Sequence, residues 1–70
     1  MTEIELRAEK AMREGDYRIA RKHAEQAAAR PMTPANQRSY ERAREWETLC
    51  LKRFVEARAR LIEQSLGEKP

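Results

Sequence analysis

Apolar residues recur at three- and four-residue steps along most of the chain, which is the spacing of one face of a helix. In the first segment these positions are Ile4, Ala8, Ala11 and Met12. Thr2 is a suitable N-cap residue, and Glu5, three residues later, completes a capping-box pattern. Glycine tolerates the backbone conformation that ends many helices, so Gly15 predicts that the first helix covers residues 3–14.

A second apolar stripe begins directly after this glycine. It consists of Tyr17, Ala20, Ala24, Ala27 and Ala28. Asp16 can cap this segment, and Pro31 ends it because proline disfavours helical backbone at the preceding residue. The pattern predicts a second helix over residues 17–30. Its very short connection to the first helix predicts an antiparallel hairpin.

Thr33 and Pro34 form a helix start, with a capping residue followed by proline at the first helical position. No breaker follows until Gly67, so we expect a third helix over residues 34–66, roughly 50 Å long at about 1.5 Å per residue. Each shorter helix would measure roughly 20 Å, less than half of that length. The expected architecture is all-α, within one domain of residues 1–70: a short helical hairpin packed on one end of a long C-terminal helix.

The apolar face of the long helix extends beyond the reach of such a hairpin. Leaving Phe54, Val55 and Leu61 in water would forfeit about 1.5–3 kcal/mol for each side chain. A second copy of the chain would cover them, so we expect a homodimer formed through this helix. Its predicted interface is Glu47, Cys50, Leu51, Phe54, Val55, Arg58, Leu61 and Ile62. A break that folds the long helix back, or a surface kept for a different partner, are the alternatives.

Two charged residues, Glu47 and Arg58, lie within this apolar arc. In an antiparallel dimer, Glu47 of one chain could meet Arg58 of the other and fix the register more than add stability. Alternatively, both side chains extend to solvent at the edge of the seam.

Composition narrows the function classes. Of the 70 residues, 40% are hydrophobic and 39% charged, with a net charge of +3, as is typical of helices with mixed-charge surfaces. A single cysteine excludes an internal disulfide and a cysteine-based zinc site, and a single histidine excludes a histidine-rich metal site. No apolar run approaches the roughly 20 residues of a membrane span. The acidic N-terminus does not resemble a signal peptide, so we expect a cytoplasmic protein without cofactors.

No catalytic constellation is apparent, and we expect no enzyme. His23 has no partner carboxylate or second histidine nearby in the sequence, and Cys50 lies on the apolar face, where free cysteine behaves as a small hydrophobe. Nucleic acid is the stronger alternative, because a dimer would present Arg18, Arg21 and Lys22 twice. Acidic residues are interleaved with most of the basic ones, which favours a solvated mixed-charge face.

Trp46 and Leu49, flanked by arginines, are typical of a protein-binding patch, since Trp, Tyr and Arg are favoured at interface hot spots. The predicted partner surface combines this patch with the outer face of the segment 17–30. Its residues are Arg18, Ile19, Lys22, His23, Tyr40, Arg42, Trp46, Leu49 and Arg53. Alternatively, the hairpin packs over Trp46 and leaves Leu49 as an isolated exposed residue.

Three stretches of the sequence resemble known proteins, and two of these resemblances point to the same function. The sequence Gly15-Asp16-Tyr17 is similar to the hairpin corner of tetratricopeptide-like units. Residues 8–44, with Gly15, Tyr17, Ala20, Ala27-Ala28 and Pro34-Ala35-Asn36, resemble the small AraC-negative-regulator and PerC-like bacterial regulators. Residues 36–46 resemble part of a phage anti-quorum-sensing protein. The resemblances to the bacterial regulators and to the phage protein both imply a small helical protein, accessory- or phage-encoded, that binds a bacterial regulatory protein and modulates or inhibits it.

Overall fold

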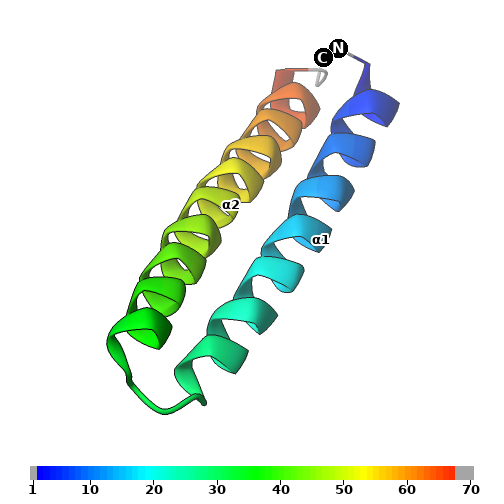
Figure 1. Ribbon diagram of the computed structural model, residues 1–70. Helices are drawn as coiled ribbons and strands as arrows, with labels where there is room; N and C mark the ends of the chain where they lie inside the picture. Colours follow the sequence, from blue (N-terminus) through cyan, green and yellow to red (C-terminus); the bar gives the residue numbers. More distant parts are fainter. Residues whose placement is uncertain (1, 68–70) are drawn as a thin grey trace.

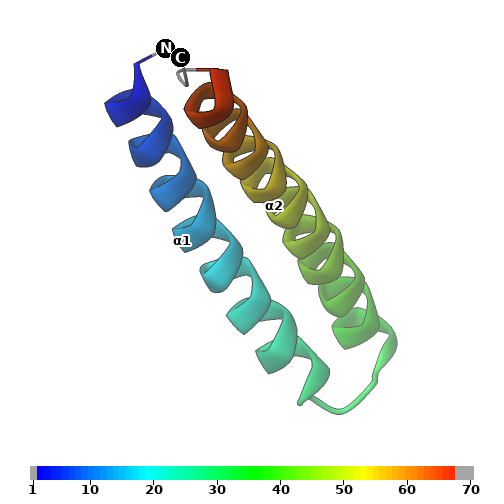
Figure 2. The ribbon, with the colours of Figure 1, turned by 180° about the vertical axis from the view of Figure 1, so that it is seen from behind.

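The computed structural model describes residues 2–67, which form two helices packed side by side. Helix α1 covers Glu3–Ala28 and helix α2 covers Pro34–Gly67. They run antiparallel, so the beginning of α1 and the end of α2 lie at one end of the molecule and the connection lies at the other (Figures 1 and 2). The result is a rod of 58 × 15 × 13 Å. The predicted all-α fold with a helical hairpin is therefore confirmed, although the hairpin is formed by α1 and α2 and not within residues 3–30.

The predicted start of α1 is confirmed in detail. The Thr2 hydroxyl accepts a hydrogen bond from the Glu5 backbone N–H at 3.2 Å, and the Glu5 carboxylate accepts one from the Thr2 backbone N–H at 3.3 Å. This reciprocal arrangement satisfies amide groups that have no partner within the helix. The same carboxylate also accepts from the Thr2 hydroxyl at 3.0 Å. Hydrogen bonding to the Thr2 side chain, and then to its backbone, lowers the pKa of Glu5.

The connection is a compact turn organised by side chains at the start of α2. Thr33 caps the helix as predicted, because its hydroxyl accepts from the Asn36 backbone N–H at 3.2 Å. The Asn36 side-chain amide donates to the Pro31 carbonyl at 2.7 Å, and the Thr33 backbone N–H donates to the same carbonyl at 2.9 Å. Pro34 occupies the first helical position, where a missing N–H costs nothing.

The predicted corner at Gly15 and Asp16 is wrong. One continuous helix, α1, replaces the two helices expected over residues 3–14 and 17–30, and Gly15 has an ordinary negative φ within it. Glycine inside a helix costs only about 0.5–1 kcal/mol relative to alanine. Ending the helix there would detach its first half from α2, where burial of the Leu6 side chain alone contributes about 1.5–3 kcal/mol. Asp16 lies 4.0 Å from Arg13 instead of capping a second helix.

The buried residues form one seam between the helices, and most of them are small. They are Leu6, Ala20, Ala24 and Ala27 on α1, and Cys50 and Ala57 on α2. Tyr17 and Phe54 stack across the seam with ring centroids 6.4 Å apart, and both remain half-buried. Small side chains let the helix axes approach closely, but a seam of alanines buries little apolar area.

The expectation that a short N-terminal hairpin covers less than half of the long C-terminal helix is also wrong. Because α1 does not turn at Gly15, its first half runs beside the C-terminal half of α2. Arg60 of α2 donates to Glu9 of α1 at 2.8 Å, which fixes this alignment. Neither helix, within the described residues, is long and apolar enough to cross a membrane.

Candidate interaction surfaces

One side of the hairpin brings together most of the residues predicted to bind a partner. The imidazole of His23 on α1 packs against the indole of Trp46 on α2, with ring centroids 5.6 Å apart. Ile19 lies one turn before His23, while Leu49 and Arg53 follow Trp46 at helical steps on the same side of α2. We call this side the His23–Trp46 face, and its predicted members are Ile19, His23, Arg42, Trp46, Leu49 and Arg53.

Three predicted partner residues lie elsewhere. Arg18 and Lys22 are each two positions from the buried Ala20, so both point away from α2. Arg18 is also held by Glu14 at 2.7 Å. Tyr40 is half-buried and lines a groove together with Tyr17, and neither His23 nor Trp46 contributes to that groove.

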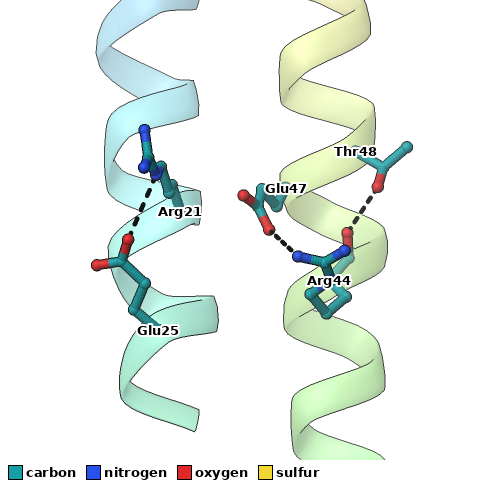
Figure 3. Close-up of polar contacts among 5 residues, drawn as sticks. All are labelled: Arg21, Glu25, Arg44, Glu47 and Thr48. Atoms are coloured by element: carbon teal, nitrogen blue, oxygen red, sulfur yellow. Dashed lines mark hydrogen bonds and ion pairs between the residues drawn. The ribbon is translucent and has the colours of Figure 1, made fainter. Parts of the chain in front are cut away.

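The groove is open, has a volume of about 440 Å³ and lies between the two helices near the connection. Its lining residues are Tyr17, Arg21, Ala24, Glu25, Ala28, Tyr40, Arg44 and Glu47. Its rim carries one ion pair from each helix, Arg21 with Glu25 and Arg44 with Glu47, both at 3.3 Å (Figure 3). The charges around the groove are therefore balanced locally.

The residues predicted to form a dimer interface divide into two sets. Cys50 is buried against α1, and Phe54 and Leu61 are half-buried on the same side of α2, so α1 of the same chain already covers much of them. Leu51, Val55 and Ile62 remain 40%, 41% and 52% exposed. With Arg58 they form a stripe at four- and three-residue steps, which we call the Leu51–Ile62 stripe.

The two charged residues of the predicted interface both have contacts within the chain. Glu47 is half-buried and pairs with Arg44. The guanidinium of Arg58 lies 5.6 Å from the centre of the Phe54 ring, a cation–π geometry. A pairing of Glu47 with Arg58 of a second copy would have to compete with these contacts.

The two candidates for chemistry, Cys50 and His23, lie in different surroundings. Cys50 is 4% exposed in the seam, and His23 packs on an aromatic ring. Within residues 2–67, no three His, Cys, Asp or Glu side chains gather in an arrangement that could hold a metal ion.

The sequence interpretation missed Met12 and Arg38 as members of the His23–Trp46 face. Met12 lies seven residues before Ile19, and Arg38 lies eight before Trp46, so each shares a helical side with a predicted member. The signal for Met12 was present but crossed the assumed break at Gly15. Treating residues 3–28 as one helix would have placed Met12 and Ile19 on one stripe.

The structure is a two-helix hairpin, and each of its two exposed sides carries both apolar and charged side chains. No family model, no curated protein and no solved structure matches the chain.

Proposed function

We propose that this chain is a small non-enzymatic helical hairpin that pairs with a second copy of itself and binds a bacterial regulatory protein, which it modulates or inhibits. The observation that carries the proposal is the mismatch between a slight core and a large apolar surface. No large side chain is fully buried among the described residues, while ten large hydrophobic residues are at least 40% exposed.

The amount of surface supports association. The chain exposes 5503 Å². A compact monomer of 8.2 kDa exposes about 4,500 Å², so the excess is about 1,000 Å². A standard protein interface buries about 800 Å² on each partner. Docking one partner along the rod would bring the exposed area to the value expected for a chain of this mass.

We assign the second copy to the Leu51–Ile62 stripe. Some of the charged side chains around it already have contacts within the chain, namely the pair Arg44–Glu47 and Arg58 over the Phe54 ring. Charged neighbours that keep contacts within their own chain lower the cost of packing this stripe against an identical one. The regulatory partner is assigned to the His23–Trp46 face on the other side of the seam. That the partner is bacterial and regulatory rests on the resemblance to PerC-like regulators.

The alternative, a dimeric DNA-binding regulator, has less support. Two of the three residues that would contact DNA are ion-paired, Arg18 with Glu14 and Arg21 with Glu25. Paired arginines release fewer counterions on binding phosphate. This alternative predicts duplex binding that weakens steeply with salt and is lost when Arg18, Arg21 and Lys22 are replaced by glutamine.

The proposal is tested by capture of partners from bacterial lysate with the tagged protein, with and without nuclease. We expect one protein that survives nuclease, is lost with the L49D variant and is kept with K22E, whose site faces away from α2. The captured protein is then assayed for its own activity with and without this chain. A nuclease-sensitive signal, equal capture by L49D, or an unchanged activity of the captured protein would contradict the proposal.

A further inference from the structure

Three arginines and two apolar residues share one stripe of α2. Arg38, Arg42, Trp46, Leu49 and Arg53 follow one another at steps of four, four, three and four residues. Such steps keep side chains on one side of a helix. The stripe is about 22 Å long, roughly four helical turns.

The arginines of this stripe differ from most others in the chain. Six arginines elsewhere are each within 4.0 Å of a carboxylate: Arg7, Arg13, Arg18, Arg21, Arg44 and Arg60. Arg38, Arg42 and Arg53 are all exposed, and none of them makes an ion pair or a side-chain hydrogen bond with another residue in the range 2–67. Within this range, the three guanidinium groups near the exposed tryptophan are therefore free of direct ion pairs, although Glu45 and Glu56 follow Arg42 and Arg53 by three residues on α2.

Helix α1 extends this surface with apolar side chains. The contact between His23 and Trp46 places the stripe of α2 beside a stripe of α1 that contains Met12 and Ile19. Met12 is 54%, Ile19 53%, Leu49 45% and Trp46 42% exposed. The His23–Trp46 face is therefore a long apolar strip with unpaired arginines along one edge.

We propose that the His23–Trp46 face binds an amphipathic helix of the partner, whose apolar side covers Ile19, Trp46 and Leu49 and whose flanking carboxylates pair with the three arginines. This inference rests on the proposed function and specifies its partner chemically. Carboxylates match guanidinium groups in charge and in bidentate geometry. An apolar helix in a groove between two helices is a common mode of recognition.

The aliphatic part of the face favours a protein over a nucleic acid. A phosphate backbone would satisfy the arginines but would leave Met12, Ile19 and Leu49 in water. An acidic amphipathic helix satisfies the arginines and covers these side chains as well. Burying each large apolar side chain contributes about 1.5–3 kcal/mol in full, so partial cover of several decides in favour of the helix.

Trp46 is the single tryptophan of the chain and lies within the proposed site, so its fluorescence reports binding directly. The probe is a synthetic helical peptide of about 18 residues, roughly 27 Å, without tryptophan, with leucines on one side and glutamates along both flanks. A second peptide carries lysines in place of the glutamates. We expect the glutamate peptide to shift the Trp46 emission to shorter wavelength saturably and to bind at least about tenfold more tightly than the lysine peptide.

Two double variants test the assignment of the arginines. R42Q/R53Q removes two charges from the face, and we expect the preference for the glutamate peptide to fall to less than about threefold. R18Q/K22Q also removes two positive charges, but from the outer side of α1, and it is expected to keep the full preference for the glutamate peptide. Glutamine is a good helix former, so both variants should retain the helical circular dichroism of the unmodified chain.

Several results would overturn the inference. They are equal binding of the two peptides, no binding of the glutamate peptide up to about 0.5 mM, and loss of preference in both double variants. A Trp46 emission that shifts with protein concentration alone would assign the face to a second copy. A shift caused only by a single-stranded oligonucleotide would assign it to nucleic acid.

The inference and the proposed function fail in different ways. If a lysate protein is captured in a manner that depends on Leu49 but the glutamate peptide does not bind, the proposed function stands and the acidic helix is wrong. If the peptide binds with the expected selectivity but no lysate protein is captured, the chemistry of the face stands and the regulatory role is wrong.

Discussion

The two long sides of the hairpin expose apolar side chains to similar extents but treat their charges differently. On the side of the groove and the Leu51–Ile62 stripe, Arg21, Arg44 and Arg58 each have a carboxylate or an aromatic ring of the same chain beside them. On the His23–Trp46 face, Arg42 and Arg53 have no carboxylate within 4.0 Å among the described residues. The difference indicates that exposed apolar area alone does not specify a partner. In our proposal, the state of the neighbouring charges distinguishes the side assigned to an identical copy from the side assigned to an acidic helix.

The largest expected effect is a loss of stability that disturbs both sides of the hairpin at once. Ala20 is fully buried in the seam, so A20L would force α1 and α2 apart and should lower the free energy of unfolding by about 1–3 kcal/mol. The control is A11L, because Ala11 is exposed on α1. Urea unfolding at one fixed protein concentration measures both variants. Equal stability of A20L and A11L would contradict the close seam.

A second prediction separates the two sides. V55D places a charge in the Leu51–Ile62 stripe and should weaken self-association by at least about tenfold, because it buries an unpaired carboxylate in the proposed dimer. L49D makes the same chemical change on the His23–Trp46 face and should leave self-association unchanged. Sedimentation equilibrium measures both. The assignment of sides is reversed if L49D dissociates the dimer and V55D does not.

A third prediction concerns the helix that both sides share. A Cβ at Gly15 would meet nothing within 4 Å, and the residue has helical backbone, so G15A should raise the free energy of unfolding by about 0.4–1 kcal/mol. If a corner existed there, the same change would destabilise the chain. Thermal unfolding of G15A beside the unmodified protein distinguishes the two geometries.

The smallest expected effect lies at the beginning of α1, away from both sides. The pKa of Glu5 is lowered on folding, chiefly by the hydrogen bond with the Thr2 side chain. Its contribution to stability is therefore present above the pKa of the unfolded chain and is lost as the pH falls through the lower pKa of the folded state. As the pH is lowered from about 5, the melting temperature should fall slightly more for the unmodified chain than for E5Q. Identical pH dependence in the two proteins would contradict the role of the carboxylate.

The sequence predicted the features that depend on neighbouring residues. The capping box of Thr2 and Glu5, and the start at Thr33 and Pro34, are local hydrogen-bonding arrangements that need no tertiary contact. The continuity of α1 through Gly15 was not predicted, because it depends on contacts with α2 that are distant in sequence.

The site residues follow the same rule. Trp46, Leu49 and Arg53 were grouped correctly from their spacing on one helix. Tyr40 lies in the groove and not beside Trp46, because the side on which α1 lies decides whether a residue at the edge of the apolar arc faces the groove or the opposite side. Spacing within α2 does not contain that information.

The buried thiol of Cys50 offers a way to measure how often the two helices separate. It is the only cysteine, and it lies between the helices with 4% of its surface accessible. A thiol reagent can reach the sulfur only when the helices separate, so under conditions of rapid opening and closing the rate of labelling reports how often the closed form opens. Any molecule that binds only the closed hairpin slows that rate in proportion to its occupancy. A single labelling curve can therefore rank candidate partners before the surface they bind is known.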